Sequence, residues 1–119
     1  MRTTRVIADL KVADIDVARA FYADFLGLSV EAFNLGWVAR FETPDGRANI
    51  QLVTRDATSP EDPVASVAVG NDIDDAYAEA QRRGYEIVHP LTHEAWGVRR
   101  FFVRDPDGNV INIVSHSDD

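Results

Sequence analysis

The alternation of hydrophobic and polar positions follows the same order in both halves of the chain. Each half begins with a short β-prone segment, at residues 5–12 and 64–69. Apolar positions at helical spacing follow Asp14 in the first half and Asp72 in the second. Both aspartates are N-cap candidates, because a carboxylate accepts hydrogen bonds from the free N–H groups of a first helical turn. The pattern predicts a strand followed by a helix, twice.

A glycine ends each predicted helix, and three more strands follow it. Gly27 and Gly84 stand where a left-handed residue closes a helix. An Asp-Gly pair, at 45–46 and again at 107–108, separates the last two strands of each half, which is typical of a hairpin turn. The expected strands span residues 28–33, 37–43 and 48–54 in the first half and residues 85–89, 98–104 and 110–115 in the second.

The two halves are copies of one module. Residues 14–18 and the Pro-Asp-Gly turn at 44–46 both recur in the second half in the same order. A polar stretch with two prolines, residues 55–63, joins the copies and is interpreted as a linker. We therefore predict an α+β fold in which all 119 residues form a single domain of two tandem βαβββ modules, 4–54 and 64–116.

One face of each predicted module has no helix to cover it. A single helix covers only one face of a four-stranded sheet, so the other face must meet another surface. We expect the two copies to form a curved mixed sheet around a cleft, and ligand pockets favour such interfaces. The sequence therefore predicts a small-molecule site in that cleft.

Composition narrows the range of functions. The net charge is −8 with 12 Lys and Arg residues, which is too few basic groups for a nucleic-acid footprint. The chain has no cysteine, so disulfides, thiolate ligands and a thiol nucleophile are excluded. Neither a signal peptide nor an apolar run of about 18 residues for a membrane span is visible. We expect a cytoplasmic protein that binds neither nucleic acid nor membranes.

Two segments carry a resemblance to a known family. Leu10 to Ile15, followed by Ala20-Phe21-Tyr22 and Phe25 to Leu28, resembles the opening of the vicinal oxygen chelate superfamily. This is the family of glyoxalase I, bleomycin-resistance proteins and extradiol dioxygenases. Trp96 to Asn109 looks like its second-module hairpin. The resemblance spans essentially the whole chain and implies paired βαβββ modules, with a homodimer completing the cleft.

The resemblance also implies where a metal would bind. Metal-dependent members carry His, Gln or Glu ligands on the first and last strands of each module. The matching positions hold Ile7, Gln51, Ala65 and Asn112. Two apolar side chains and two neutral amides do not meet the need of such a site for several imidazole or carboxylate ligands. We therefore expect no metal and no other cofactor.

A displaced site with a divalent metal as cofactor is the alternative. Its candidate ligands are Asp9, His89, His93 and Glu94. Pro90 disfavours the helix that would place both histidines on one face, so a polar loop over the cleft is the simpler interpretation of residues 89–94. No catalytic residue is assigned, because the chain has no Gly-x-Ser-x-Gly elbow and no serine beside a histidine outside its tail.

Strand alternation sets which side chains share a face of the sheet. With Gln51 and Asn112 in the cleft, Ile7, Asp9 and Val67 are expected on the same side. Several aromatic side chains can stack on a flat ligand. They are Phe33, Trp37, Phe41, Trp96 and Phe102.

Trp96 is the strongest aromatic candidate, because it lies beside a polar loop and an arginine pair. Arg99 and Arg100 point to opposite faces of one strand. A solvent-exposed position is the simplest expectation for each, and one of them can reach a ligand anion. The predicted ligand-binding residues are Ile7, Asp9, Trp37, Gln51, Val67, Trp96, Arg100, Phe102 and Asn112.

Three functions remain open at this point. The first is a glyoxalase/bleomycin-resistance-like protein that binds a small apolar or aromatic molecule without a metal, as in antibiotic sequestration. The second is a metal-dependent lyase, isomerase or dioxygenase of the same superfamily with an atypical site. The third is a module that mediates protein association. Metal content separates the first two, and quenching of Trp fluorescence by a ligand separates the first from the third.

Overall fold

The computed structural model describes residues 1–116, which divide into two compact units. The N-terminal unit comprises residues 7–58, and the C-terminal unit comprises residues 1–6 and 59–116. Residues 1–6 join the C-terminal unit through backbone contacts, such as the Thr4 N–H that donates to the Ala68 carbonyl at 2.8 Å. Strands and helical segments occur in both units, so the predicted α+β class is confirmed.

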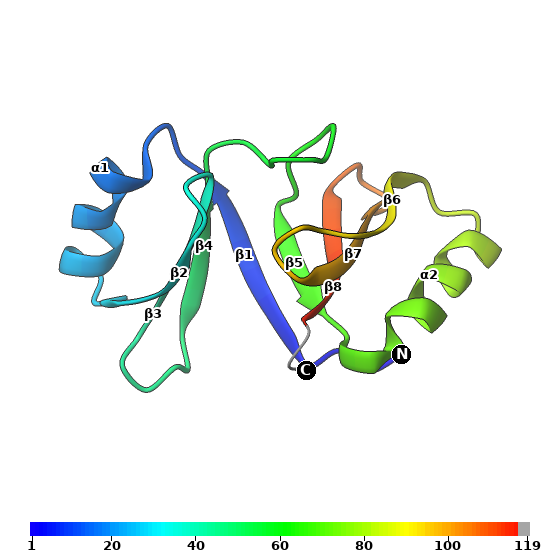
Figure 1. Ribbon diagram of the computed structural model, residues 1–119, viewed down its shortest axis with the longest axis horizontal. Helices are drawn as coiled ribbons and strands as arrows, with labels where there is room; N and C mark the ends of the chain where they lie inside the picture. Colours follow the sequence, from blue (N-terminus) through cyan, green and yellow to red (C-terminus); the bar gives the residue numbers. More distant parts are fainter. Residues whose placement is uncertain (117–119) are drawn as a thin grey trace. The chain divides into compact units, whose positions relative to one another are not determined.

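The N-terminal unit is a four-stranded mixed sheet with one helical segment against it (Figure 1). Its strands lie in the order β2-β3-β4-β1, with β1 parallel to β4 and the other pairs antiparallel. Strand β1 (Arg5–Lys11) lies in this unit from residue 7 onward. The other elements are α1 (Ile15–Arg19), η1 (Ala20–Phe25), β2 (Val30–Asn34), β3 (Val38–Glu42) and β4 (Asn49–Val53).

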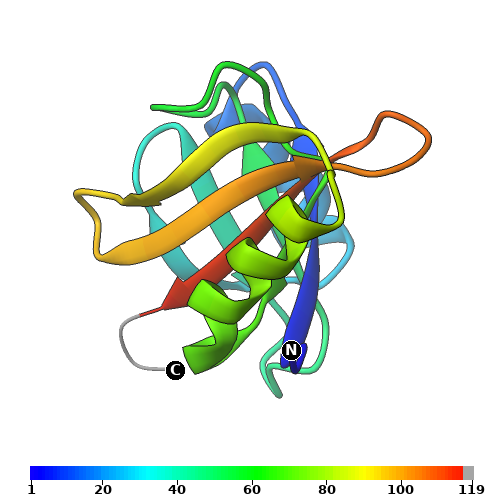
Figure 2. The same cartoon turned by 90° about the vertical axis from the view of Figure 1, so that its right-hand side faces the viewer.

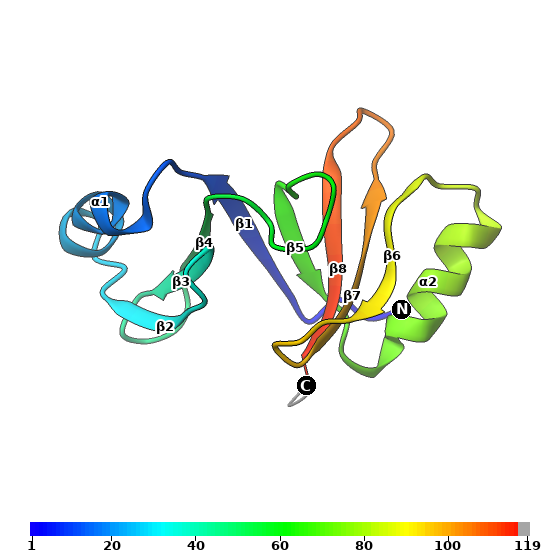
Figure 3. The same cartoon turned by 45° about the horizontal axis from the view of Figure 1, so that its top comes forward.

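The C-terminal unit repeats this arrangement. Its strands lie in the order β5-β8-β7-β6, with β5 parallel to β8, as Figure 3 shows. Helix α2 crosses one face of this sheet (Figure 2). The bounds are β5 (Ala65–Ala68), η2 (Gly70–Asp72), α2 (Ile73–Arg82), β6 (Ile87–His93), β7 (Val98–Arg104) and β8 (Val110–His116). Within residues 1–116, no helix has the length and hydrophobicity needed to cross a bilayer.

Each unit packs its helical segment on the sheet through an apolar core. In the C-terminal unit, the fully buried Phe101 of β7 meets the Tyr77 ring of α2 at a centroid distance of 4.9 Å. The buried members of this core are Val69, Ile73, Ala76, Ala80, Phe101 and Ile113. Those of the N-terminal core are Ile15, Ala23, Ala39, Phe41 and Leu52. Because side chains alternate along a strand, these residues mark the helix-side face of each sheet.

The predicted helix boundaries are partly confirmed. The Asp14 carboxylate accepts the Val17 N–H at 3.1 Å, which is the expected N-cap. The same prediction is wrong for Asp72, whose carboxylate makes no cap to α2 and accepts the Arg2 N–H at 2.8 Å instead. Gly27 and Gly84 close the helices with φ of 82° and 74°, in the left-handed region that favours glycine.

The first helix changes from α to π geometry halfway along, which its apolar spacing did not predict. Across η1 the Leu26 N–H donates to the Phe21 carbonyl, five residues back, at 3.0 Å. The wider turn keeps the Phe21 and Phe25 rings together, with a centroid distance of 5.4 Å. Both rings are exposed, as is Val17 one turn earlier. No such row of large apolar side chains is exposed on α2.

Strand β6 is longer than predicted and runs to His93. The interpretation of residues 90–93 as part of a polar loop is therefore wrong, because they form the second half of this strand. The Asp105 carboxylate shapes the hairpin turn between β7 and β8. It accepts the side-chain N–H of Asn109, and this hydrogen bond together with backbone N–H groups holds the pKa of Asp105 below its ordinary value.

Candidate functional site

The face of each sheet that no helix covers carries buried polar side chains. In the N-terminal unit, three of them and one half-buried phenyl ring lie side by side across the four strands, because their Cα atoms are cross-strand partners. We call this set the N-terminal row, and its members are Asp9 of β1, Gln51 of β4, Arg40 of β3 and Phe33 of β2.

The N-terminal row is joined by contacts from end to end. Gln51 Nε2 donates to Asp9 Oδ1 at 2.6 Å, and Gln51 Oε1 accepts from Arg40 Nε at 3.2 Å and from its second guanidinium nitrogen at 3.0 Å. The Arg40 guanidinium lies 4.9 Å from the centre of the Phe33 ring, as a cation–π contact. Both ends of the Gln51 amide therefore have hydrogen-bond partners inside the unit.

The C-terminal unit has an equivalent row at the same places in its sheet. Its members are Ser66 of β5, Asn112 of β8, Phe102 of β7 and His89 of β6. A β-bulge between Ile87 and His89 turns His89 to the helix-free face, and a bulge between Glu31 and Phe33 does the same for Phe33. The two rows thus occupy equivalent strands, with the same register and an equivalent β-bulge in each unit.

The amide of Asn112 differs from that of Gln51 in its partners. Asn112 Nδ2 donates to Ser66 Oγ at 3.0 Å. Asn112 Oδ1 is buried, and no donor in the described part of the chain reaches it. The reason is local: Phe102 occupies the register position that Arg40 occupies in the N-terminal row, and a phenyl ring has no N–H to give.

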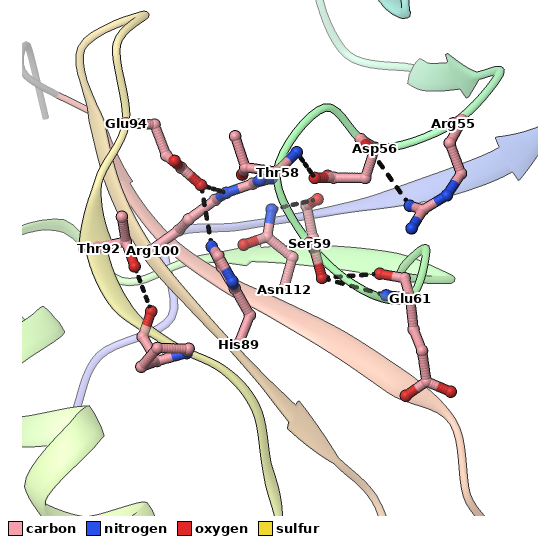
Figure 4. A network of polar contacts seen from close by, with 12 residues as sticks. Arg55, Asp56, Thr58, Ser59, Glu61, His89, Thr92, Glu94, Arg100 and Asn112 are labelled. Atoms are coloured by element: carbon pink, nitrogen blue, oxygen red, sulfur yellow. Dashed lines mark hydrogen bonds and ion pairs between the residues drawn. The ribbon is translucent and has the colours of Figure 1, made fainter.

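A buried ion-paired network lies beside the C-terminal row. Arg100 Nε donates to Glu94 Oε2 at 2.6 Å, and His89 Nε2 lies 3.1 Å from the same oxygen. Figure 4 shows the three side chains pointing toward one another. Arg100 is 3% exposed and Glu94 is 5% exposed, so their charges are almost fully removed from water. Two charges buried in this way are tolerated in a folded protein only where each compensates the other.

Aromatic rings surround the Arg100 guanidinium. Its carbon lies 5.0 Å from the centre of the Trp96 ring and 4.7 Å from that of Phe102. Trp96 is half-buried and packs against an apolar cluster of Ala68, Val98 and Val114. Trp96 is therefore partly accessible to solvent.

Comparisons with known proteins agree with this geometry. The family model of the Glyoxalase/Bleomycin resistance protein/Dioxygenase superfamily matches residues 6–113. The chain belongs to this superfamily. No curated protein matches the chain significantly.

Solved structures show the glyoxalase-superfamily fold at low sequence identity. A superfamily member from Vibrio splendidus 12B01 aligns with a TM-score of 0.70 and 18% identity, over 96% of this chain and 99% of its own. Methylmalonyl-CoA epimerase from Mycobacterium tuberculosis gives 0.70 and 24%, over 97% and 89%. The Mn(II)-bound glyoxalase from Novosphingobium aromaticivorans gives 0.68 and 24%, over 96% of this chain and 39% of its own.

The positions at which the superfamily resemblance implies metal ligands do not fit a metal here. Ile7 is apolar and buried, and the Arg40 guanidinium points its positive charge at Gln51 Oε1. A cation at that oxygen would meet the repulsion of a second cation about 3 Å away. Among residues 1–116, no group of three His, Cys, Asp or Glu side chains is placed to hold a metal ion.

The predicted faces are wrong for the first strand of the C-terminal unit. Val67 packs with the helix-side core, and Ala65 pairs with Ile111, which packs there too. Ser66 is the residue beside Asn112, one position away from the predicted Ala65. The one-residue error turned every side chain of this short strand to the opposite face.

Other predicted site residues divide between the two faces. Ile7 is buried and shares by alternation the face of Asp9. Phe41 lies in the helix-side core, so its place among the stacking candidates is wrong. Trp37 directly precedes β3 and is half-buried, and its carbonyl accepts the Thr54 N–H at 2.9 Å.

The arginine pair divides as its alternation predicts. Arg99 meets the exposed Asp74 carboxylate at 2.7 Å, and this contact holds the pKa of Asp74 below its ordinary value. Arg100 is buried, so the expectation of solvent exposure is wrong for it. The interpretation of residues 89–94 as a polar loop is wrong for His89 and Glu94, which are both buried.

Sequence reasoning missed Arg40 and Ser66. The signal for Arg40 was its even spacing from Val38 and Glu42 on the strand that pairs with Gln51. Ser66 could have been found by asking which residue of its strand offers a partner to the Asn112 amide.

Proposed function

We propose that this superfamily member binds a small apolar or aromatic molecule without a metal, on the helix-free face of its C-terminal unit. Sequestration of an antibiotic is one role of this kind. The observation that carries the proposal is the half-buried Trp96 ring, held on the apolar cluster with the Arg100 guanidinium 5.0 Å from its centre. A half-buried indole side chain held by such contacts is a suitable platform for stacking a flat ligand.

The proposal of metal-independent binding rests on the amide positions. Gln51 is engaged by Asp9 and by Arg40, and Asn112 by Ser66. A metal at either amide would have to displace these buried hydrogen bonds and, at Gln51, approach a guanidinium. Neutral amides also bind divalent transition metals less well than imidazole and carboxylate groups do.

A metal-dependent lyase, isomerase or dioxygenase remains the second candidate. His89 and Glu94 are two of the proposed displaced ligands, and they do lie within 3.1 Å of each other. However, Glu94 also receives the Arg100 guanidinium at 2.6 Å, which opposes a second cation at the same carboxylate. The binding function is therefore favoured.

Replacing Trp96 with alanine is expected to weaken the binding of an aromatic probe such as naphthol by about ten- to a hundredfold. Alanine removes the stacking surface, and stacking on one aromatic side chain contributes about 1–3 kcal/mol in comparable sites. Isothermal titration calorimetry measures the dissociation constant directly, without relying on the fluorescence of the residue that is removed.

Phe21→Ala is the matched control for this experiment. Phe21 is 51% exposed on η1, so its loss removes an aromatic ring from a surface outside the proposed site. Its affinity for naphthol should equal that of the unmodified protein. Equal affinity in the Trp96 variant would remove Trp96 from the binding site.

A further inference from the structure

The N-terminal row and the C-terminal row can be compared residue by residue, because they occupy equivalent positions in their sheets. Each places an amide on the last strand of its unit, with a hydrogen-bonding side chain on the first strand and another residue on the neighbouring third strand. In the N-terminal row both ends of the amide are bonded, to Asp9 and to Arg40. In the C-terminal row only the nitrogen end is bonded, to Ser66.

The unbonded Asn112 oxygen is costly in a folded chain. Asn112 is 7% exposed, and its Oδ1 has no donor within residues 1–116. Buried polar atoms are hydrogen-bonded in the great majority of cases, so an exception needs a physical reason. Here the Arg of the N-terminal row is replaced by Phe102, which removes the donor and leaves an apolar ring beside the acceptor.

We propose that Asn112 Oδ1 accepts a hydrogen bond from the bound molecule, so that the site selects aromatic ligands carrying a neutral O–H or N–H group. Asn112 Oδ1 is closed off from solvent in the unliganded chain, so the ligand reaches it by displacing a neighbouring side chain. The ligand donor then takes the place that the Arg40 guanidinium has in the N-terminal row. This inference rests on the proposed binding function and specifies its ligand class.

The residues around Asn112 indicate the charge and the aromatic character of the ligand. Phe102 is its cross-strand neighbour, and the Arg100 guanidinium lies 4.7 Å from the centre of that ring. Arg100 and Glu94 already form an ion pair, so neither a cationic nor an anionic ligand finds an uncompensated charge in this pair. An aromatic body with a neutral donor, such as a phenol or a primary amide, matches the apolar ring and the acceptor.

The test compares two probes that differ only in the donor, naphthol and its methyl ether. Their dissociation constants are measured by NMR titration on the full chain and on Asn112→Leu, which keeps the shape and removes the acceptor. The ratio of the two constants should favour naphthol about tenfold more in the unmodified protein than in the variant. Comparison of ratios removes the difference in hydrophobicity between the probes.

Each result has a distinct meaning. The same ratio in both proteins would overturn the role of Asn112 while leaving the binding function intact. A preference of the unmodified protein for the ether, relative to the variant, would show that the amide presents its N–H instead, and would also overturn the inference. Absence of binding for both probes would count against the proposed function as well.

Stability gives a second readout that does not depend on a ligand. Asn112→Leu should change the melting temperature little, because the removal of an unsatisfied buried acceptor offsets the loss of the hydrogen bond from Asn112 Nδ2 to Ser66 Oγ. The matched Gln51→Leu variant should have a melting temperature about 5 °C lower or more. Leucine cannot replace the hydrogen bonds that the Gln51 amide makes with Asp9 and with Arg40. A comparable loss in both variants would show that the Asn112 oxygen is satisfied within the folded protein and would overturn the inference.

Discussion

Replacing Glu94 with alanine is expected to lower the free energy of unfolding by about 3–5 kcal/mol, because it removes the carboxylate that faces a buried guanidinium. Arg100 Nε lies 2.6 Å from Glu94 Oε2, and both side chains are 4% exposed. The turn between β6 and β7 should keep its conformation, because the backbone N–H of Glu94, which donates to the Val98 carbonyl, is unaffected by the substitution. Urea denaturation followed by circular dichroism measures the change.

An exposed ion pair formed by Arg99 of β7, the neighbour of Arg100, provides the control for the Glu94 variant. Arg99 and Asp74 are 41% and 67% exposed, so water screens their attraction and Asp74→Asn should leave the free energy of unfolding nearly unchanged. A loss of less than about 1 kcal/mol for Glu94→Ala would show that the charge of Arg100 is compensated in another way. In that case the network is not a desolvated ion pair.

Replacing Phe101 with alanine is expected to cost about 3–5 kcal/mol, because it opens a cavity in the core beneath α2. The ring is 1% exposed and packs on Tyr77 at 4.9 Å. Phe25→Ala is the control, since a ring that is 74% exposed should change the free energy of unfolding by no more than about 0.5 kcal/mol. Equal effects of the two substitutions in urea denaturation would contradict the assignment of Phe101 to the core.

The duplicated order of strands and helices was predictable because it depends on local signals. Hydrophobic spacing, the Asp14 cap and the glycines with positive φ all act within a few residues of one another. The π geometry of η1 was not predictable from this pattern, since Phe21 and Phe25 fit an ordinary helix equally well. Asp72 failed as a cap because its backbone belongs to the 3₁₀ turn η2 and is not extended, and its carboxylate accepts the N–H of a distant residue, Arg2.

The site was predicted less completely because it depends on register between strands. Gln51 and Asn112 were found through the superfamily resemblance and Asp9 from its own strand. Arg99 and Arg100 were placed on opposite faces correctly by alternation. Two β-bulges turn Phe33 and His89 to the helix-free face, and a sequence carries no clear mark of a bulge.

The pairing of Ser66 with Asn112, rather than Ala65, needs the register of a parallel strand pair whose partners lie far apart in the chain. The homodimer and the cytoplasmic location stay predictions.

The central claim is that this superfamily member binds an aromatic molecule without a metal. It is tested most directly by calorimetric titration of naphthol into chelator-treated protein, repeated after addition of Mn(II), Fe(II), Ni(II) or Zn(II). We predict saturable binding in the chelator-treated protein, with an affinity that none of the metals changes. Binding that appears only when one of these metals is restored would contradict the claim and would favour the metal-dependent enzyme.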